Sequence, residues 1–226
     1  LLSRNGLNID IDVQGLTPLK VAEHNNHTEI VSLLHQYSMR KGFRILMKSA
    51  IATDDVSNVK TLLDSEMVGV NDVIYRGLTV LMFACDKGHV DVVRVLLKQK
   101  NILVNQAGKD GATPLFFACR KGHVNVVQVL LARKEIDINQ AMQDEWTPLH
   151  VVCQNGHEDI VRLFLAREEI QINQEGKKGI TPLLIACKEG HVGVARLLLT
   201  KKETQINQAN EDGTTPLYIA SQQGHV

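Results

Sequence analysis

Apolar and polar positions recur along this chain with a fixed period. Five segments open on the same Thr-x-Leu pattern, each 34 residues after the previous one, at Thr79, Thr113, Thr147, Thr181 and Thr215. A small residue pair, mostly Ala-Cys, and then a Gly-His pair follow in every segment, and four of the five continue into an aliphatic run such as Val129-Leu130-Leu131. Self-similarity at a fixed period of this length is the sequence signature of a repeat architecture.

The segment that begins at Thr113 predicts a first short helix. Threonine is a good N-cap, and Pro114 suits the first helical position because its missing amide has no partner there anyway. Gly122 predicts the end of this helix in a left-handed conformation. An apolar stripe of residues three and four apart is formed by Leu115, Ala118 and Cys119.

A second helix is expected from about Val124, with Val127, Leu130 and Leu131 on its buried face. The alternating residues Ile136 to Asn139 then predict a short extended arm before the turn that leads to the next threonine. Helices of two to three turns are marginal alone, so these units are expected to hold only by stacking on their neighbours.

Two weaker copies precede the regular ones, and the spacing between them breaks the period. Thr17 and Ile45 begin these copies only 28 residues apart, whereas Ile45 precedes Thr79 by 34. We expect residues 1–35 to end one array (a partial helix plus one repeat), 36–44 to be a linker or irregular connection, and 45–226 to be an array of about five repeats, the last incomplete. One continuous stack with a shortened connection is the alternative.

The repeat pattern resembles the ankyrin repeat family, whose units open with Thr-Pro-Leu-His and contain a hairpin turn and two helices. The resemblance implies an all-α solenoid of stacked helix-turn-helix units joined by short β-hairpin-like loops. The chain departs from the family in three ways. Its period is 34 instead of 33, the usual glycine between Leu131 and Asn139 is missing, and the histidine of the first helix remains only at His150.

Composition excludes several classes of function. The 25 basic and 25 acidic residues balance, which argues against a dedicated nucleic-acid binder. No apolar run is long enough to span a bilayer, so direct membrane insertion is not expected. Neither end carries the polar capping face that a terminal repeat needs, and Leu1-Leu2 look like the end of a preceding helix, so we expect a monomeric fragment of a longer protein.

Cysteine and histidine recur as Cys-x-x-x-His, a spacing that invites a metal site. The four cysteines, however, are spaced by the repeat period, so each occupies the same column of its own repeat: Cys85, Cys119, Cys153 and Cys187. We therefore expect buried, reduced, slowly reacting thiols, with no metal and no cofactor. Such thiols indicate a reducing compartment, cytoplasmic or nuclear. No nucleophile, base and orienting group converge, so the chain is not expected to be an enzyme.

One asparagine has two interpretations. Leu131, Asp137, Ile138 and Asn139 match the pattern that, by family resemblance, asparaginyl hydroxylases accept in ankyrin repeats. Asn139 is thus a possible hydroxylation site. The simpler interpretation, which we favour, is that this asparagine hydrogen-bonds the hairpin loop.

The family resemblance implies that partners bind the concave side formed by hairpin tips and first helices. On that side the columns before each Thr and before each Gly-His vary while the framework columns barely change. The predicted partner-binding residues are Tyr75, Arg76, Lys87, Lys109, Arg120, Lys121, Gln143, Trp146, Asn155, Lys178 and Lys188. Trp146, the only tryptophan, is expected at the centre as an apolar anchor, because tryptophan is enriched at binding hot spots. The alternative is that Trp146 only stiffens the row of hairpins.

These features predict a protein–protein interaction module with a protein partner and no nucleic-acid partner. The alternative function is a regulatory or targeting segment of a larger enzyme or membrane protein.

Overall fold

The computed structural model describes residues 17–225. The helices are α1 (Pro18–His24), α2 (Thr28–Ala52), α3 (Val56–Asp64), α4 (Val80–Lys87), α5 (Val90–Leu97), α6 (Pro114–Lys121), α7 (Val124–Leu131), α8 (Pro148–Asn155), α9 (Glu158–Leu165), α10 (Pro182–Lys188), α11 (Val192–Leu198) and α12 (Pro216–Gln222). The strands β1 (Val73–Tyr75) and β2 (Leu78–Thr79) and the 3-10 helix η1 (Lys177–Gly179) lie in hairpins.

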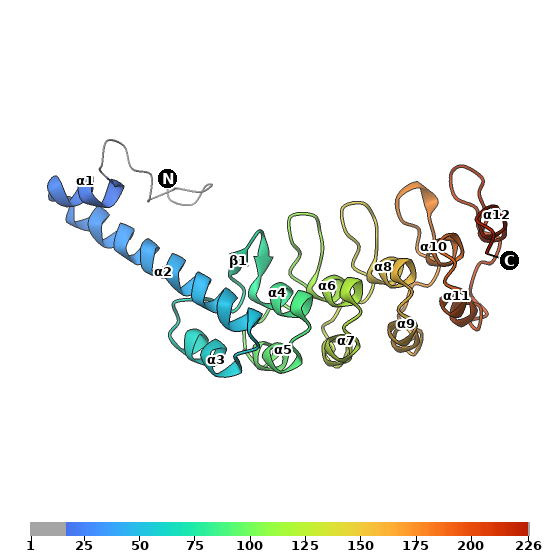
Figure 1. Ribbon diagram of the computed structural model, residues 1–226, viewed down its shortest axis with the longest axis horizontal. Coiled ribbons are helices and arrows are strands. Elements are labelled where there is room, and N and C mark those ends of the chain that lie inside the picture. The colour runs from blue at the N-terminus through green and yellow to red at the C-terminus, as the bar shows by residue number, and fades with distance from the viewer. Residues whose placement is uncertain (1–16, 226) are drawn as a thin grey trace.

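The helices stack in two parallel rows, as Figure 1 shows. One row holds the first helices α4, α6, α8, α10 and α12, and each packs on the next. The other row holds the second helices α3, α5, α7, α9 and α11, which also contact their neighbours in order. Loops project from the first-helix row on one side of the stack. This arrangement confirms the all-α repeat solenoid expected from the sequence.

The threonine that opens each regular repeat caps its first helix. The Thr113 hydroxyl accepts a hydrogen bond of 3.2 Å from the backbone N–H of Phe116, and Pro114 occupies the first helical turn. Thr79, Thr147, Thr181 and Thr215 make the equivalent bond in their own repeats. Gly122 ends α6 with φ of +72°, the left-handed conformation expected from the sequence.

The second helices end without a glycine, which follows from the missing glycine of this variant repeat. The C-cap of α7 is Ala132 in the right-handed α conformation. Arg133, the next residue, donates from Nη1 to the carbonyl oxygen of Leu97 at the end of α5, over 3.0 Å. A cation at a helix C-terminus satisfies a carbonyl that has no intrahelical partner, so the column after the second helix links one repeat to the previous one.

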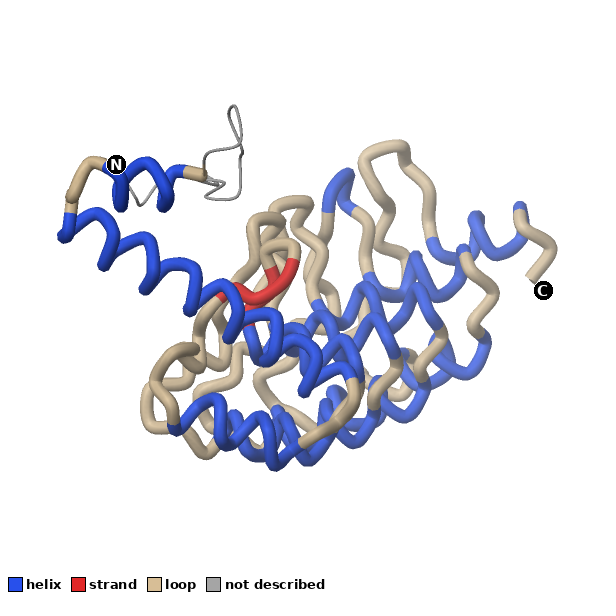
Figure 2. Tube along the Cα trace, turned by 60° about the vertical axis from the view of Figure 1, so that its left-hand side comes forward, coloured by secondary structure: helices blue, strands red, loops and turns tan. Residues whose placement is uncertain are grey.

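The arm expected at Ile136 to Asn139 forms coil and a turn, not a strand. Within residues 17–225, β1 and β2 of the first hairpin are the only strands. They pair antiparallel, with Val73 opposite Thr79 and Tyr75 opposite Leu78. A later hairpin is closed by hydrogen bonds from Met142 N–H to the Trp146 carbonyl over 2.9 Å and from Glu145 N–H to the Met142 carbonyl over 3.0 Å. The loops therefore keep a hairpin course with little strand structure, as Figure 2 shows.

A continuous hydrophobic core runs through the stack from Met47 in α2 to Leu198 in α11. The residues expected on the buried stripes are buried, namely Leu115, Ala118, Cys119, Val127, Leu130 and Leu131. The two helices of each repeat pack on each other and on the helices of both neighbouring repeats, so the core is continuous from one repeat to the next.

Residues 36–44 lie inside α2, so the irregular connection expected there is a helix. The segment contains no proline and a single glycine, Gly42, which costs a helix only about 1 kcal/mol relative to alanine. The second helix of the copy that begins at Thr17 consequently runs straight into the first helix of the next copy. The C-terminal half of α2 packs on α3 and α4 and completes the regular stack.

The N-terminal half of α2 projects from the stack and carries α1 at its far end (Figures 1 and 2). Ala22 and Leu34 form a small core of their own, with Leu19, Val31 and Tyr37 packed against it. This cluster is separate from the main core. The features expected at Leu1-Leu2 lie outside the described residues.

Candidate protein-binding face

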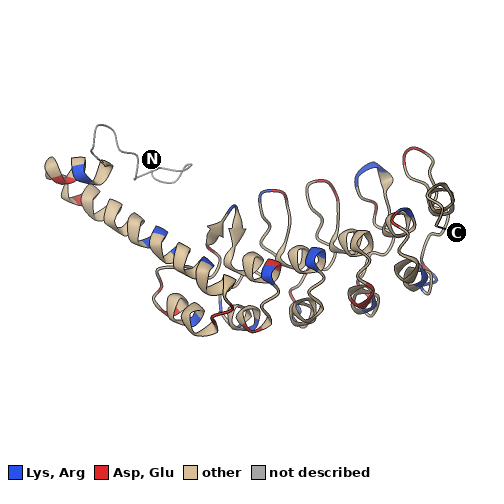
Figure 3. Cartoon of the chain, in the orientation of Figure 1, with Lys and Arg blue, Asp and Glu red and all other residues tan. Residues whose placement is uncertain are grey.

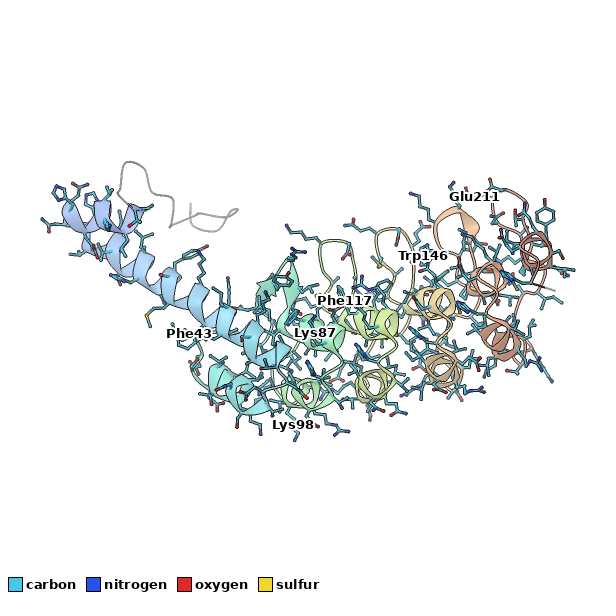
Figure 4. All side chains as sticks on the ribbon, viewed as in Figure 1. Phe43, Lys87, Lys98, Phe117, Trp146 and Glu211 are labelled. Atoms are coloured by element: carbon cyan, nitrogen blue, oxygen red, sulfur yellow. The ribbon has the colours of Figure 1, made fainter. Side chains whose placement is uncertain are left out.

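One side of the stack is formed by the hairpin loops and the exposed sides of the first helices. We call this surface, which includes the C-terminal half of α2, the hairpin face. Figure 4 shows Lys87, Phe117 and Trp146 along the first-helix row and Lys98 at the second-helix row on the opposite side. The predicted partner-binding residues therefore divide into those exposed on the hairpin face and those that pack within it.

Most of the predicted residues are exposed. The exposed ones are Arg76, Lys87, Lys109, Arg120, Lys121, Gln143, Asn155, Lys178 and Lys188. Two aromatic members of the set, Tyr75 and Trp146, are only partly buried. Figure 3 shows charged residues of both signs on the loops and first helices of this face.

Backbone hydrogen bonds link the hairpins that precede α6, α8 and α10. The backbone N–H of Gln143 donates to the backbone carbonyl of Asp110 over 3.0 Å, and the backbone N–H of Lys177 donates to the backbone carbonyl of Asp144 over 3.2 Å. The side chain of Gln143 also donates to the Lys109 carbonyl over 2.8 Å. The loops therefore form a connected row, and Gln143 already uses its side-chain amide within that row.

Trp146 packs sideways while leaving part of its ring exposed. Its ring centroid lies 5.8 Å from that of His150, tilted by 35°. A Cβ atom added to Gly176 in the next hairpin would lie 3.3 Å from Cδ1 of Trp146, so the indole covers that glycine closely. This contact supports the packing role for Trp146, and its partial exposure leaves room for a contact with a partner.

Arg120 is held by contacts that the sequence columns did not reveal. Its Nη2 lies 3.3 Å from Oδ1 of Asp86, one repeat earlier, and its guanidinium Cζ lies 4.9 Å from the centroid of the Phe117 ring. Asp86 also approaches Lys87 at 3.9 Å. The only sequence signal for the ion pair is that Asp86 and Arg120 occupy the same column of successive repeats.

Tyr75 sits at the N-terminal end of the hairpin face. Lys48 of α2 places its Nζ 3.9 Å from the centroid of the Tyr75 ring, which also meets Phe83 edge to face at 5.7 Å. Lys48 was not among the predicted residues. It lies in the degenerate copy that begins at Ile45, where no Thr-x-Leu marks the register.

The Gly-His histidines link the repeats. Nε2 of His123 lies 3.1 Å from the Asp86 carbonyl, and Nε2 of His191 lies 2.9 Å from the Gln154 carbonyl. Each ring also packs on the glycine of the previous repeat, as His157 does on Gly122. These contacts give the histidine column a role in stacking.

His150, the one first-helix histidine, is fully buried. Its Nδ1 accepts the backbone N–H of Thr147 over 3.1 Å, so the proton is on Nε2, which donates to the Ile180 carbonyl over 3.0 Å. Burial lowers its pKa to about 4 and outweighs the bond to Ile180, which favours the charged form. His150 is thus a neutral side chain whose hydrogen bonds connect its own repeat to the next one.

Asn139 is one of four asparagines that make the same pair of bonds to the next repeat. Its Nδ2 donates to the Glu169 carbonyl over 2.7 Å and its Oδ1 accepts the Gln171 N–H over 3.0 Å. The other three are Asn71, Asn105 and Asn173. The geometry supports the structural interpretation of this asparagine, and hydroxylation of Asn139 stays a prediction from the resemblance.

All four cysteines are free thiols. Cys85, Cys119 and Cys153 are fully buried, and burial raises their pKa well above the usual range for a thiol. Cys187 is only partly buried, and burial raises its pKa as well. Across residues 17–225, no three His, Cys, Asp or Glu side chains come together as a metal site would require.

A family model described as ankyrin repeats matches the chain over residues 46–142, 133–210 and 168–226, which together span 46–226. The chain belongs to the ankyrin repeat family. No curated protein matches it significantly. Ankyrin repeats are generally protein-interaction modules, and the fold is typically non-catalytic. Within the described residues, no helix of this ankyrin repeat chain is long and apolar enough to cross a membrane.

Proposed function

We propose that this chain is a protein-binding module whose partner lies along the hairpin face. The observation that carries the proposal is that different residues of each repeat stack the repeats and face solvent. The columns that stack the five regular repeats hold the same residue types, namely the capping threonine, the glycine–histidine pair and the asparagine. The columns that reach solvent on the hairpin face vary much more, although a few residue types recur in them, such as Lys87 and Lys121.

A constant framework with a variable surface is what a recognition scaffold requires, because stability and specificity then reside in different side chains. The hydrogen bonds that join Gln143 to Asp110 and Lys177 to Asp144 hold successive loops in fixed positions. A partner therefore meets a row that is already ordered, which reduces the entropy cost of binding.

The centre of the proposed interface is Trp146, with polar and basic residues around it. Arg120, Lys121 and Lys178 are exposed in the repeats on either side. An apolar aromatic anchor within a polar rim is the usual anatomy of a protein interface.

The proposal is tested by selecting short peptides from a random display library against the chain and measuring their affinity for the Trp146→Ala variant. Loss of affinity on the order of 2 kcal/mol would support Trp146 as an anchor. Because Trp146 also packs on His150 and Gly176, the melting point is measured in parallel. A lower melting point with unchanged affinity would assign Trp146 to stiffening of the hairpins and overturn the anchor role.

A further inference from the structure

Cationic groups lie over aromatic rings at the N-terminal end of the hairpin face. Nζ of Lys48 lies 3.9 Å from the centroid of the Tyr75 ring, and Cζ of Arg76 lies 5.3 Å from the same centroid. The two cations come from different elements, since Lys48 is on α2 and Arg76 follows β1 in the first hairpin. The Tyr75 ring therefore contacts two cationic side chains, Lys48 from α2 and Arg76 from its own hairpin.

The same arrangement continues on the next two first helices. Nζ of Lys87 lies 5.4 Å from the Phe83 centroid on α4, and Arg120 lies over Phe117 on α6. Because Tyr75 and Phe83 meet edge to face, the first two ring sites are continuous. We call this set the cation–aromatic cluster; its members are Lys48, Arg76, Lys87 and Arg120 on the rings of Tyr75, Phe83 and Phe117.

The rings fix where the charges sit. Phe83 is 3% exposed and Phe117 is 5% exposed, so both are anchored in the core and cannot move away from the cations. A cation held over a ring has fewer rotamers to lose when a ligand arrives, and the cation–ring contact is itself favourable. The cluster is therefore a preorganised set of positive groups.

The local charge balance is positive. Lys109 and Lys121 are exposed beside the cluster. The nearby carboxylate of Asp86 is 16% exposed, whereas the side chains of Lys87 and Arg120 that contact it are 41% and 44% exposed. Asp110 is exposed, and its Oδ1 accepts a hydrogen bond from the backbone N–H of Ala112. An approaching molecule therefore meets mainly cations.

We infer that the hairpin face over α2, α4 and α6 binds an acidic segment of a partner protein, one with several Asp or Glu side chains. This inference rests on the proposed function and specifies its partner. A neutral or basic partner would bury these cations without compensation, which is costly, whereas carboxylates replace the lost water with charge-assisted hydrogen bonds.

A peptide fits this face better than a nucleic acid does. The hairpin tips that follow alternate in charge, with Asp144 and Glu145 in one, Lys177 and Lys178 in the next, and Glu211 and Asp212 in the last. A phosphate backbone running along the row would be repelled by these carboxylates, and nucleic-acid binding requires a sustained basic track. A peptide can place its acidic residues over the cation–aromatic cluster and other residues beyond it.

The experiment uses peptides selected from a random display library against the whole chain, together with two matched charge-reversal variants. The test variant combines Lys87→Glu and Lys121→Glu on the hairpin face. The control combines Lys98→Glu and Lys134→Glu, which are exposed at the ends of second helices and change the net charge equally. Fluorescence anisotropy gives the affinity at several salt concentrations, with oligothymidylate and phosphatidylserine vesicles as competing anionic probes.

The selected peptides should be rich in Asp and Glu and should bind the test variant at least about tenfold more weakly, while the control changes little. Their affinity for the unaltered chain should fall as salt rises. Selected peptides that are neutral or basic, an equal loss in both variants, or tighter cluster-dependent binding of either anionic probe would each overturn the inference. Neutral peptides that still need Trp146 would leave the proposed function standing, whereas failure to select any peptide would count against both.

Discussion

The imidazole of His157 lies directly against Gly122 of the previous repeat. A Cβ atom on Gly122 would be 2.7 Å from Cε1 of His157, closer than real Cβ contacts come. Gly122 has φ of +72° and ends α6. The same residue therefore caps its own helix and leaves the space that the His157 ring occupies. Gly88 and Gly156 meet His123 and His191 in the same way. The glycine of each of these Gly-His pairs thus packs against the histidine of the pair in the next repeat.

Gly122→Ala is therefore expected to destabilise the chain more than Gly77→Ala. Both glycines have positive φ, but a Cβ on Gly77 would have nothing within 4 Å. The left-handed conformation alone costs alanine about 1–2 kcal/mol, and the clash with His157 raises the expected loss at Gly122 to about 3 kcal/mol. Urea unfolding midpoints measure both. In a His157→Ala background the extra loss at Gly122 should shrink, and equal losses at the two glycines would refute the contact.

Asn139→Ala should lower the free energy of unfolding by about 1–2 kcal/mol, because it removes two hydrogen bonds to the next repeat and leaves the Glu169 carbonyl and Gln171 N–H without them. The control is Asn125→Ala on the exposed side of α7, which should be neutral or slightly stabilising because alanine is the better helix former. Urea unfolding compares the two, and an unchanged midpoint for Asn139→Ala would contradict the structural role of this asparagine.

His150 should make stability depend on pH in a defined window. Its pKa is about 4 in the folded chain against about 6.5 when exposed, so the unfolded state binds more protons between these values. Stability is therefore complete above about pH 6.5 and falls as pH drops toward 4, by up to roughly 3 kcal/mol from this residue. His150→Gln should show a shallower fall in the thermal midpoint over that window. Identical pH profiles would mean that His150 titrates normally.

The four thiols should react with iodoacetamide in a fixed order. Cys187 is partly buried whereas Cys85, Cys119 and Cys153 are fully buried, so Cys187 should be alkylated first in the native chain. The other three should react only when the fold opens, because a buried thiol with a raised pKa is inert. Peptide mass spectrometry assigns the sites with and without urea. Fast native labelling of Cys119, or stoichiometric bound zinc, would contradict this account.

The repeat columns allowed the regular part of the fold to be predicted because each position has a local physical role. Thr113, Pro114 and Gly122 determine the ends of α6 by capping and dihedral preference alone. The long helix α2 could not be predicted from a positive sequence signal, because it forms where a signal for a turn is lacking. The segment around Gly42 lacks the turn residues that separate the other repeats, so nothing interrupts the helix.

On the hairpin face, the sequence identified which columns reach solvent, but not which side chains meet there. The ion pair between Arg120 and Asp86 and the contact between Lys48 and Tyr75 join different repeats. Such pairs depend on how far one repeat is rotated on the next, and a single sequence does not encode that rotation in any local pattern. The sideways packing of Trp146 on Gly176 has the same origin.

The most direct test of the account is to map a selected peptide onto the chain by nuclear magnetic resonance, following backbone amide shifts during titration. Binding at the hairpin face predicts shifts in the loops and in α4, α6 and α8, accompanied by a change in the fluorescence of Trp146, the only tryptophan. Amides of the second helices α5, α7 and α9 should move little. Shifts concentrated on those second helices, with unchanged Trp146 fluorescence, would contradict the central claim that this chain binds its partner through the hairpin face.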